Sequence, residues 1–370
     1  MNWAVVMTGG RGTRFWPESR NRRPKPFLKL LGRKTLLEET VRRLHPLFPP
    51  GRILIVLQDS LVREARKLFP KIPRENILGE PLGRNTAPCC VYAAAQIERR
   101  DPEAKIVFLP SDQLIHPVSL YLKTLRTAFR LADEKPVLLG MRPDSPQTGY
   151  GYLEAGQRRR IHGISYFSVK RFREKPRLAQ ARRFLKQGNF FWNGGTFIWR
   201  LDAFKRAVRK YAPKICAAWN QLATPSPIPS PPGRGRGSPA GRSGRGERER
   251  LRRIYRILPS ISLDYAVMEK IRDAHCLLAP FQWSDLGGWI GISEFWPSDA
   301  KGNRRRGNAI FIKSNRNIVK GNQRLIALVG AKDLIVVDTD DALLVCDRSH
   351  AEEVREVVKE IEKCGATQYL

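Results

Sequence analysis

The sequence lacks the features that mark membrane, secreted and zinc-binding proteins. It contains no run of about 18 apolar residues, so we expect no membrane-spanning helix. The N-terminus passes directly into an apolar stretch without a charged region and a cleavage site, and we therefore expect a cytoplasmic protein. There are six cysteines and five histidines, and no C-x-x-C pair, so we expect reduced core cysteines rather than a zinc site.

Acidic residues are scarce relative to basic ones. The chain has 35 Asp and Glu against 67 Lys and Arg, a formal net charge of +32. Such a charge is compatible with nucleic-acid binding, since basic surfaces release phosphate counterions. It is also compatible with a solvated basic surface that attracts anionic substrates. The charge is spread along the whole chain, and no helix-turn-helix, zinc-finger or RNA-recognition signature is visible, which favours the second interpretation.

Alternating strand-like and helix-like segments occupy the N-terminal part of the chain. This alternation predicts an α/β fold, a Rossmann-like sheet with helices on both faces. Because such sheets bind ligands beyond the carboxyl ends of their strands, the loops after the first and third strands should share one face. We expect strands at 3–8, 52–57, 105–110 and 136–140, and helices at 35–45, 60–69, 87–100 and 119–132.

The rest of the chain predicts a second domain and an insertion. Evenly spaced short apolar segments after Trp296 indicate a small β-solenoid or a meander, followed by one amphipathic helix. We therefore expect a catalytic domain at 1–297 and a C-terminal domain at 298–370. The Pro, Gly, Ser and Arg-rich segment 224–250 should be disordered, because it has too little apolar surface to offset the entropy of ordering.

A glycine-rich loop from Gly9 to Phe27 follows the first strand and reads GGRGTRFWPESRNRRPKPF. The backbone N–H groups of such a turn can cradle phosphate oxygens, and Arg11, Arg14 and Lys25 can neutralise their charge. The spacing fits neither a dinucleotide-binding G-x-G-x-x-G turn, because Phe15 stands at the third glycine position, nor a P-loop. A tight turn without a ligand is the remaining structural alternative.

This loop resembles the signature of sugar-1-phosphate nucleotidyltransferases. The strings GGRGTR, Trp16-Pro17, Ser19-Arg20 and Pro24-Lys25-Pro26-Phe27 are most similar to the mannose-1-phosphate guanylyltransferase branch. The resemblance implies transfer of GMP from GTP to mannose 1-phosphate with release of pyrophosphate, and Mg²⁺ as cofactor. It also implies a nucleotidyltransferase fold with a left-handed β-helix-like appendage that helps to form a homodimer.

Nucleotidyl transfer needs carboxylates for a metal ion and basic groups for the phosphates. Asp112 in FLPSDQL and Asp285 in FQWSDLGGW each follow a strand-like segment, although an aspartate there can also be a turn former or helix cap. The resemblance assigns both aspartates to Mg²⁺, and Arg14 and Lys25 to the reacting phosphates. The family more often has Pro-Ala-Asp-His around the first aspartate, so the nucleotide contact is expected to differ here.

The remaining family-like strings predict the nucleotide and sugar contacts. GEPLGRNTAP at 79–88, TGYGYLE at 148–154, FREKP at 172–176 and FFWNGGTF at 190–197 occur in the family's order. Thr86 could equally begin a helix as its cap, and the Glu174–Lys175 pair could be an exposed ion pair. The resemblance implies nucleotide contacts by Gly9, Gly10, Gly12, Thr13, Asn85 and Thr86, and sugar contacts by Gly151, Glu174, Lys175 and Asn193.

Two other functions remain open from the sequence. One is a related transferase that uses glucose 1-phosphate or another nucleoside triphosphate. The other is a non-catalytic relative that serves as a regulatory or nucleic-acid-binding subunit. The presence of Lys25, Asp112 and Asp285 argues against the second, because the loss of such charged groups would have indicated it.

Overall fold

The chain folds into two units that do not follow the predicted boundary at residue 297. The computed structural model describes residues 1–223 and 240–370. The first unit contains Met1–Gly9, Val41–Ser111 and Ile115–Trp283, and the second contains Gly10–Thr40, Asp112–Leu114 and Ser284–Leu370. The glycine-rich loop Gly9–Phe27, called the phosphate loop below after its predicted role, therefore belongs from Gly10 onward to the same unit as the C-terminal region.

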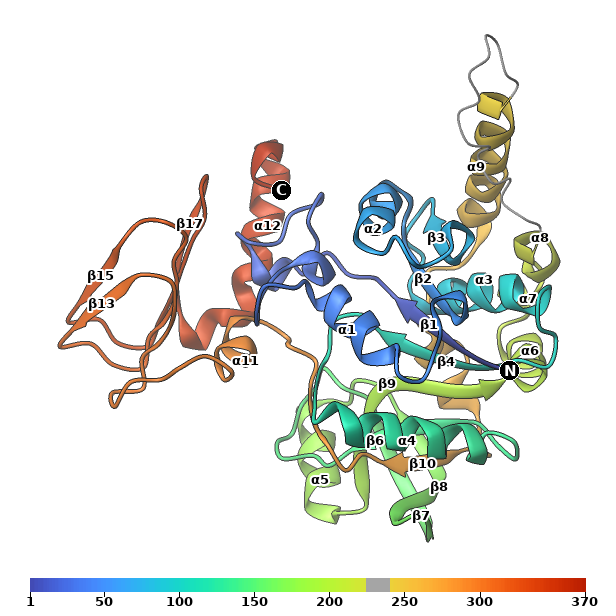
Figure 1. The fold of residues 1–370 in the computed structure, drawn as a ribbon. Helices are drawn as coiled ribbons and strands as arrows, with labels where there is room; N and C mark the ends of the chain where they lie inside the picture. Colours follow the sequence, from blue (N-terminus) through green and yellow to red (C-terminus); the bar gives the residue numbers. More distant parts are fainter. Residues whose placement is uncertain (224–239) are drawn as a thin grey trace. The chain divides into compact units, whose positions relative to one another are not determined.

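A mixed nine-stranded sheet forms the centre of the first unit in the described part of the chain (Figure 1). Its order is β3-β2-β1-β4-β9-β6-β10-β8-β7, with β1 to β4 mutually parallel and β9 antiparallel to both β4 and β6. The strands are β1 (Asn2–Met7), β2 (Ile53–Gln58), β3 (Ile77–Glu80), β4 (Lys105–Pro110), β6 (Val137–Met141), β7 (Tyr152–Ile161), β8 (Ile164–Arg173), β9 (Phe190–Arg200) and β10 (His275–Leu278).

All four strands expected in the first 140 residues are confirmed within one or two residues. Met7 of β1 pairs with Pro110 of β4, and the Ser111 amide donates to the Met7 carbonyl at 3.1 Å. The carboxyl ends of these two strands thus lie at the same sheet edge, as predicted. The short β5 (Leu114–His116) and β11 (Gln282–Ser284) pair in a separate two-stranded sheet.

Helices cover both faces of the large sheet. Trp3, Val5 and Met7 belong to a core with helix α3, whereas Ala4 and Val6 are fully buried on the opposite face. The helices are α1 (Leu36–Leu44), α2 (Val62–Leu68), α3 (Thr86–Glu98), α4 (Val118–Leu131), α5 (Leu178–Gln187), α6 (Leu201–Tyr211), α7 (Pro213–Cys216), α8 (Trp219–Ala223), α9 (Ala240–Ile257) and α10 (Leu263–Ala266). The expected helices correspond to α1 to α4.

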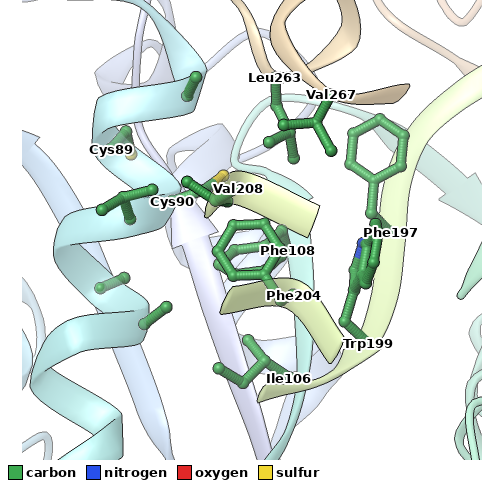
Figure 2. Close-up of a cluster of buried hydrophobic side chains, with 14 of the residues drawn as sticks. Cys89, Cys90, Ile106, Phe108, Phe197, Trp199, Phe204, Val208, Leu263 and Val267 are labelled. Carbon is green, nitrogen blue, oxygen red and sulfur yellow. The ribbon is translucent and has the colours of Figure 1, made fainter. Parts of the chain in front are cut away.

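Aromatic side chains fill the core between the sheet and helices α3 and α6. Figure 2 shows Phe108 of β4, Phe197 of β9 and Phe204 of α6 close together beneath the cysteines of α3. The rings of Phe108 and Phe204 have centroids 4.9 Å apart. Cys89, Cys90 and Cys276 are buried as predicted for core cysteines, whereas Cys216 and Cys346 are half-buried and Cys364 is exposed.

Part of the predicted disordered segment is helical. Residues 224–239 lie outside the described residues, but residues 240–250 form the first turns of helix α9, so the prediction of disorder is wrong there. The physical reason is the sequence that follows, because Leu251, Ile254 and Tyr255 repeat at helical spacing and are buried. Arg250 also donates to the Gln221 carbonyl at 3.0 Å, which ties this part of the helix to α8.

The C-terminal part of the second unit is a β-solenoid, as predicted. Strands β12 to β16 alternate between a four-stranded sheet, β12-β14-β16-β17, and a two-stranded sheet, β13-β15, and β17 then pairs antiparallel with β16 (Figure 1). The strands are β12 (Arg304–Arg306), β13 (Ala309–Ile312), β14 (Ile318–Lys320), β15 (Ile326–Val329), β16 (Leu334–Asp338) and β17 (Leu343–Asp347). The expected terminal helix begins as a 3-10 turn, Arg348–Glu353, and continues as α12 (Val354–Lys363).

The core of the second unit explains why it crosses the predicted boundary. Phe15 and Trp16 of the phosphate loop are buried together with Trp289 and Trp296, and with solenoid residues such as Ile335. Helix α11 (Trp289–Ser293) supplies part of this cluster. Loop, helix and solenoid thus bury one apolar surface, which ties residues 10–40 to the C-terminal region.

The turns of the solenoid are linked by buried asparagines, which gives a stability prediction. The Asn317 side chain donates to Asn303 Oδ1 at 2.9 Å and to the Ala331 carbonyl at 3.0 Å, and it accepts from the Leu334 amide at 2.9 Å. Asn317→Ala should lower the free energy of unfolding by about 2–4 kcal/mol, because buried polar partners lose their hydrogen bonds. Thermal or urea unfolding measures this, with exposed Asn322→Ala as the control, and equal effects of the two variants would contradict it.

Candidate active site

The phosphate loop is held in one conformation by backbone contacts within the second unit. Gly12 adopts φ 66°, and a Cβ at this position would collide with Lys25. The amide of Phe15 and the hydroxyl of Ser19 both donate to the Gly12 carbonyl, at 2.8 and 2.7 Å. Gly10 also has a positive φ of 88°, whereas Gly9 belongs to the first unit. Glycine is required at position 12, since a side chain there would displace Lys25.

Lys25 joins three segments that are distant in the sequence. Its ammonium lies 2.8 Å from Asp112 Oδ2 and donates to the Asp285 backbone carbonyl at 2.6 Å. The side chain of Lys25 is only 11% exposed, and the Phe15 ring lies 5.8 Å from its nitrogen. Three of the four residues predicted to be catalytic are therefore neighbours in the second unit.

Arg14, the fourth, lies beside the Asp285 segment. Its guanidinium donates to the Gly287 carbonyl at 3.3 Å and forms an ion pair of 2.8 Å with Glu352. A Cβ at Gly287 would stand 3.5 Å from the Asp285 carboxylate and 3.7 Å from the Arg14 guanidinium. The two charged groups therefore lie on the same side of Gly287. Thr13 begins the 3-10 turn Thr13–Phe15 that holds Arg14 in this position.

The donor set fits a magnesium ion rather than a transition metal. Asp112 and Asp285 offer hard carboxylate oxygens, and the described residues contain no cluster of three or more His, Cys, Asp and Glu that could hold a metal alone. Mg²⁺ commonly uses one or two carboxylates and completes its shell with water and substrate phosphates. Two aspartates are therefore the type of donor that such an ion uses when it binds together with a nucleotide.

Asn85 and Thr86 both have structural roles at the start of α3. The Asn85 side chain accepts from the Thr86 amide at 2.8 Å, and Asn85 has φ 65°, so the helix cap is Asn85 rather than Thr86. The Thr86 hydroxyl accepts from the Leu263 amide at 2.8 Å. These contacts fix the GEPLGRNTAP loop in the first unit, and the predicted nucleotide contacts remain predictions.

The four predicted sugar residues lie together in the first unit. The backbone amide of Asn193 donates to the Gly151 carbonyl at 2.8 Å, and a Cβ at Gly151 would come within 2.5 Å of Glu174 Oε2. Glycine is therefore required here too, because a larger residue would push Glu174 aside. Lys175 has φ 44° and lies 3.5 Å from Glu174.

Two carboxylates that the sequence analysis did not select complete this cluster. Asp264 accepts from the Asn193 side chain at 2.9 Å, and Glu269 accepts from the Glu174 backbone amide at 2.7 Å. Asn193 Oδ1 also accepts from the Gly195 amide at 3.1 Å. The only sequence signal was an acidic residue within the apolar string LDYAVM, which does not distinguish a site residue from a helix turn.

Burial changes the acidity of this cluster. It raises the pKa of Glu174 from 4.5 to about 7, with a further increase from the charge of Asp264 and an opposing effect of Lys175. Burial also raises the pKa of Asp264. Near neutral pH Glu174 is therefore partly protonated and can either donate or accept a hydrogen bond.

A cavity of ≈ 510 Å³ in the first unit lies outside these clusters. Trp192 and Trp283 line it, together with Met141, Arg142 and Phe281. The Tyr150 ring contacts both tryptophans, with centroids 5.1 and 5.4 Å apart. None of the predicted site residues lines this cavity.

Comparison with known proteins identifies the family. The nucleotidyl transferase family model matches residues 3–301, and the model of the mannose-phosphate isomerase/GMP-like β-helix domain matches residues 307–361. The chain belongs to the nucleotidyl transferase family. It is a sugar-1-phosphate nucleotidyltransferase with a C-terminal β-helix-like domain, as the sequence motifs predicted.

Relatives match the chain over nearly its whole length. It is 33% identical to mannose-1-phosphate guanylyltransferase of Escherichia coli K12, over 99% of this chain and 75% of that protein. It is also 33% identical to the xanthan biosynthesis protein XanB of Xanthomonas campestris, over 98% of this chain and 74% of that protein. A crystal structure described as mannose-1-phosphate geranyltransferase of Thermus thermophilus has a TM-score of 0.82 at 32% identity, covering 98% and 99% of the two chains.

No helix among the described residues has the length and apolarity needed to cross a membrane.

The raised pKa of Glu174 gives a prediction about stability and pH. Because the folded state binds this proton more tightly than the unfolded chain, the free energy of unfolding should fall as pH rises from about 4.5 to about 7. Glu174→Gln should reduce this slope and make the protein more stable than wild type at pH 8, by on the order of 1–3 kcal/mol. Urea unfolding from pH 4.5 to 8 measures the slope, and exposed Glu103→Gln is the control. An unchanged slope in Glu174→Gln would contradict the assignment.

Proposed function

We propose that the protein transfers GMP from GTP to mannose 1-phosphate, producing GDP-mannose and pyrophosphate. The observation that carries this proposal is the meeting of Lys25, Asp112 and the Asp285 backbone in one unit. The specificity rests on relatives named mannose-1-phosphate guanylyltransferase that match 99% of the chain.

The reaction is a single in-line displacement. A phosphate oxygen of mannose 1-phosphate attacks the α-phosphorus of GTP and forms the new P–O bond. The bond from the α-phosphorus to the bridging oxygen breaks, and pyrophosphate leaves with the electron pair. No protein nucleophile is required, so the chain's part is to position the reactants and to neutralise charge.

Lys25 and Arg14 supply the positive charge. The low exposure of Lys25 strengthens its interaction with a phosphate, since water screens it less. Its ammonium has three donors, so it can keep the Asp285 carbonyl and turn another N–H toward a phosphoryl oxygen. Arg14 presents a fork that matches phosphate oxygens, and the loop amides from Gly10 to Thr13 add further donors.

Asp112 and Asp285 would hold Mg²⁺. When bound, the ion neutralises negative charge on the phosphates as the reaction proceeds. Lys25 compensates the charge of Asp112 at 2.8 Å. This ion pair keeps the carboxylate oriented and prevents an uncompensated negative charge next to the incoming nucleotide.

The cluster of Gly151, Glu174 and Asn193 would bind the sugar. Hydroxyl groups both donate and accept, and a half-protonated carboxyl can match either role. The Asn193 amide is oriented by Asp264, which keeps the site rigid before the sugar arrives. Lys175 is about half exposed and can approach the sugar phosphate.

The substrate pair is tested by measuring pyrophosphate release with Mg²⁺. Mannose 1-phosphate and glucose 1-phosphate are crossed with GTP, ATP and UTP, and the proposal predicts the highest kcat/KM for mannose 1-phosphate with GTP. Activity with a different pair would retain the enzyme class and contradict the specificity. No activity with any pair would favour a regulatory or nucleic-acid-binding role.

Removal of the Lys25 charge tests the mechanism. Lys25→Met should lower kcat by on the order of 10²-fold or more, because a preorganised charge at the reacting phosphates is lost. The matched control is Lys29→Met, four residues away and exposed, which should retain activity within about threefold of wild type. Turnover of Lys25→Met at the control level would show that Lys25 is not at the reacting phosphates.

A further inference from the structure

Two arginines of the phosphate loop are paired with carboxylates from the end of the chain. Arg14 Nε lies 2.8 Å from Glu352 Oε2, and Arg11 Nη1 lies 2.6 Å from Glu362 Oε1. Glu352 belongs to the 3-10 turn after the last solenoid strand, and Glu362 to helix α12. All four residues belong to the second unit, so the pairs are internal to it.

These carboxylates already bind the guanidinium groups that the phosphates of a nucleotide would need. A guanidinium remains charged at any physiological pH, and its fork of N–H groups donates to carboxylate and phosphate oxygens with the same geometry. Arg14 uses its Nη1 for the Gly287 carbonyl and its Nε for Glu352. A phosphate that reaches this edge of Arg14 must therefore replace the Glu352 carboxylate.

We infer that Glu352 and Glu362 are positioning residues that hold Arg14 and Arg11 until the phosphates of the nucleotide displace them. This inference rests on the proposed function, because it concerns the same phosphate loop. The carboxylates compete with the ligand, and their removal should strengthen phosphate binding. They also keep two like-charged side chains oriented when no nucleotide is bound.

The pairs are not needed to hold the loop in place. The Trp16 indole donates to the Tyr369 carbonyl at 3.0 Å, and Arg20 forms an ion pair of 2.7 Å with Asp341. Phe15 and Trp16 are buried in the core of the unit. By contrast, Glu352 is 67% exposed and Glu362 is 43% exposed, so their ion pairs contribute little to folding.

Binding of inorganic pyrophosphate to the full chain tests the inference directly. Calorimetric titration at low ionic strength should show about two- to fivefold tighter binding for Glu352→Gln and for Glu362→Gln, the range expected from exposed ion pairs. The double variant should gain roughly tenfold. The gain should shrink as salt is added, because salt screens exposed charges.

Two controls separate competition from other effects. Glu356→Gln removes a negative charge from α12 that pairs with Lys359 rather than with the loop. Glu360→Gln likewise removes a negative charge from α12 that pairs with Lys363 rather than with the loop. Both should leave pyrophosphate affinity near wild type. An equal gain in Glu356→Gln, or unchanged or weaker binding in the Glu352 and Glu362 variants, would overturn the inference.

Steady-state kinetics give a second readout. With the substrate pair that the enzyme uses, Glu352→Gln should lower KM for the nucleotide while kcat stays within about twofold, because the carboxylate competes only in the ligand-free state. A fall in kcat with unchanged KM would overturn the inference. Failure of the proposed function would appear in wild type as no turnover with any pair, whereas the pyrophosphate titration does not depend on turnover.

Discussion

The candidate active site depends on one largely buried lysine. The Lys25 side chain is 11% exposed and its ammonium needs partners, which are the Asp112 carboxylate and the Asp285 carbonyl. These partners follow β4 and β11, so a single amine connects the phosphate loop to two later segments. The absent side chain of Gly12 leaves room for Lys25. The arrangement therefore brings the Asp112 carboxylate, a charged amine and the backbone of the Asp285 segment into one place, without a dedicated metal cluster among the described residues.

The phosphate loop is best understood as part of the C-terminal unit. Its aromatic residues share a core with helix α11 and the solenoid, and its arginines are paired with residues between Asp341 and Glu362. The β-helix-like domain is thus more than a separate appendage, since it supports the loop that we propose to bind phosphates. A substitution in the solenoid core can affect nucleotide binding through this shared packing.

The proposed sugar cluster follows a different physical principle. It is acidic and buried, and Glu174, Asp264 and Glu269 lie within a small volume with one partly exposed lysine. Burial raises the pKa of Glu174 and of Asp264, so keeping these two groups ionised inside the cluster is costly at high pH. This cost is compatible with a binding role, because sugar hydroxyls supply the hydrogen bonds that water would otherwise provide.

The sequence by itself determined the family, the solenoid, helices α1 to α4 and four strands of the first 140 residues, but it missed the short strands β3 and β5. Those features depend on local apolar periodicity and on contiguous motifs such as GGRGTR, which a linear reading detects. It did not determine the boundary of the second unit, because the packing of Phe15 with Trp289 joins residues that are far apart in the chain. It also predicted disorder at 240–250, where the chain is helical because these residues continue helix α9 from its buried positions after residue 250.

Only the tertiary structure showed how the site residues are partnered. The sequence selected Lys25, Asp112 and Asp285 separately, but their contact depends on which strands are neighbours in the fold. Asp264, Glu269, Glu352 and Glu362 had no distinguishing local pattern, since an acidic residue on a helix or turn is usually solvated. Their partners come from distant segments, and side-chain pairing across such distances is decided by packing rather than by local sequence.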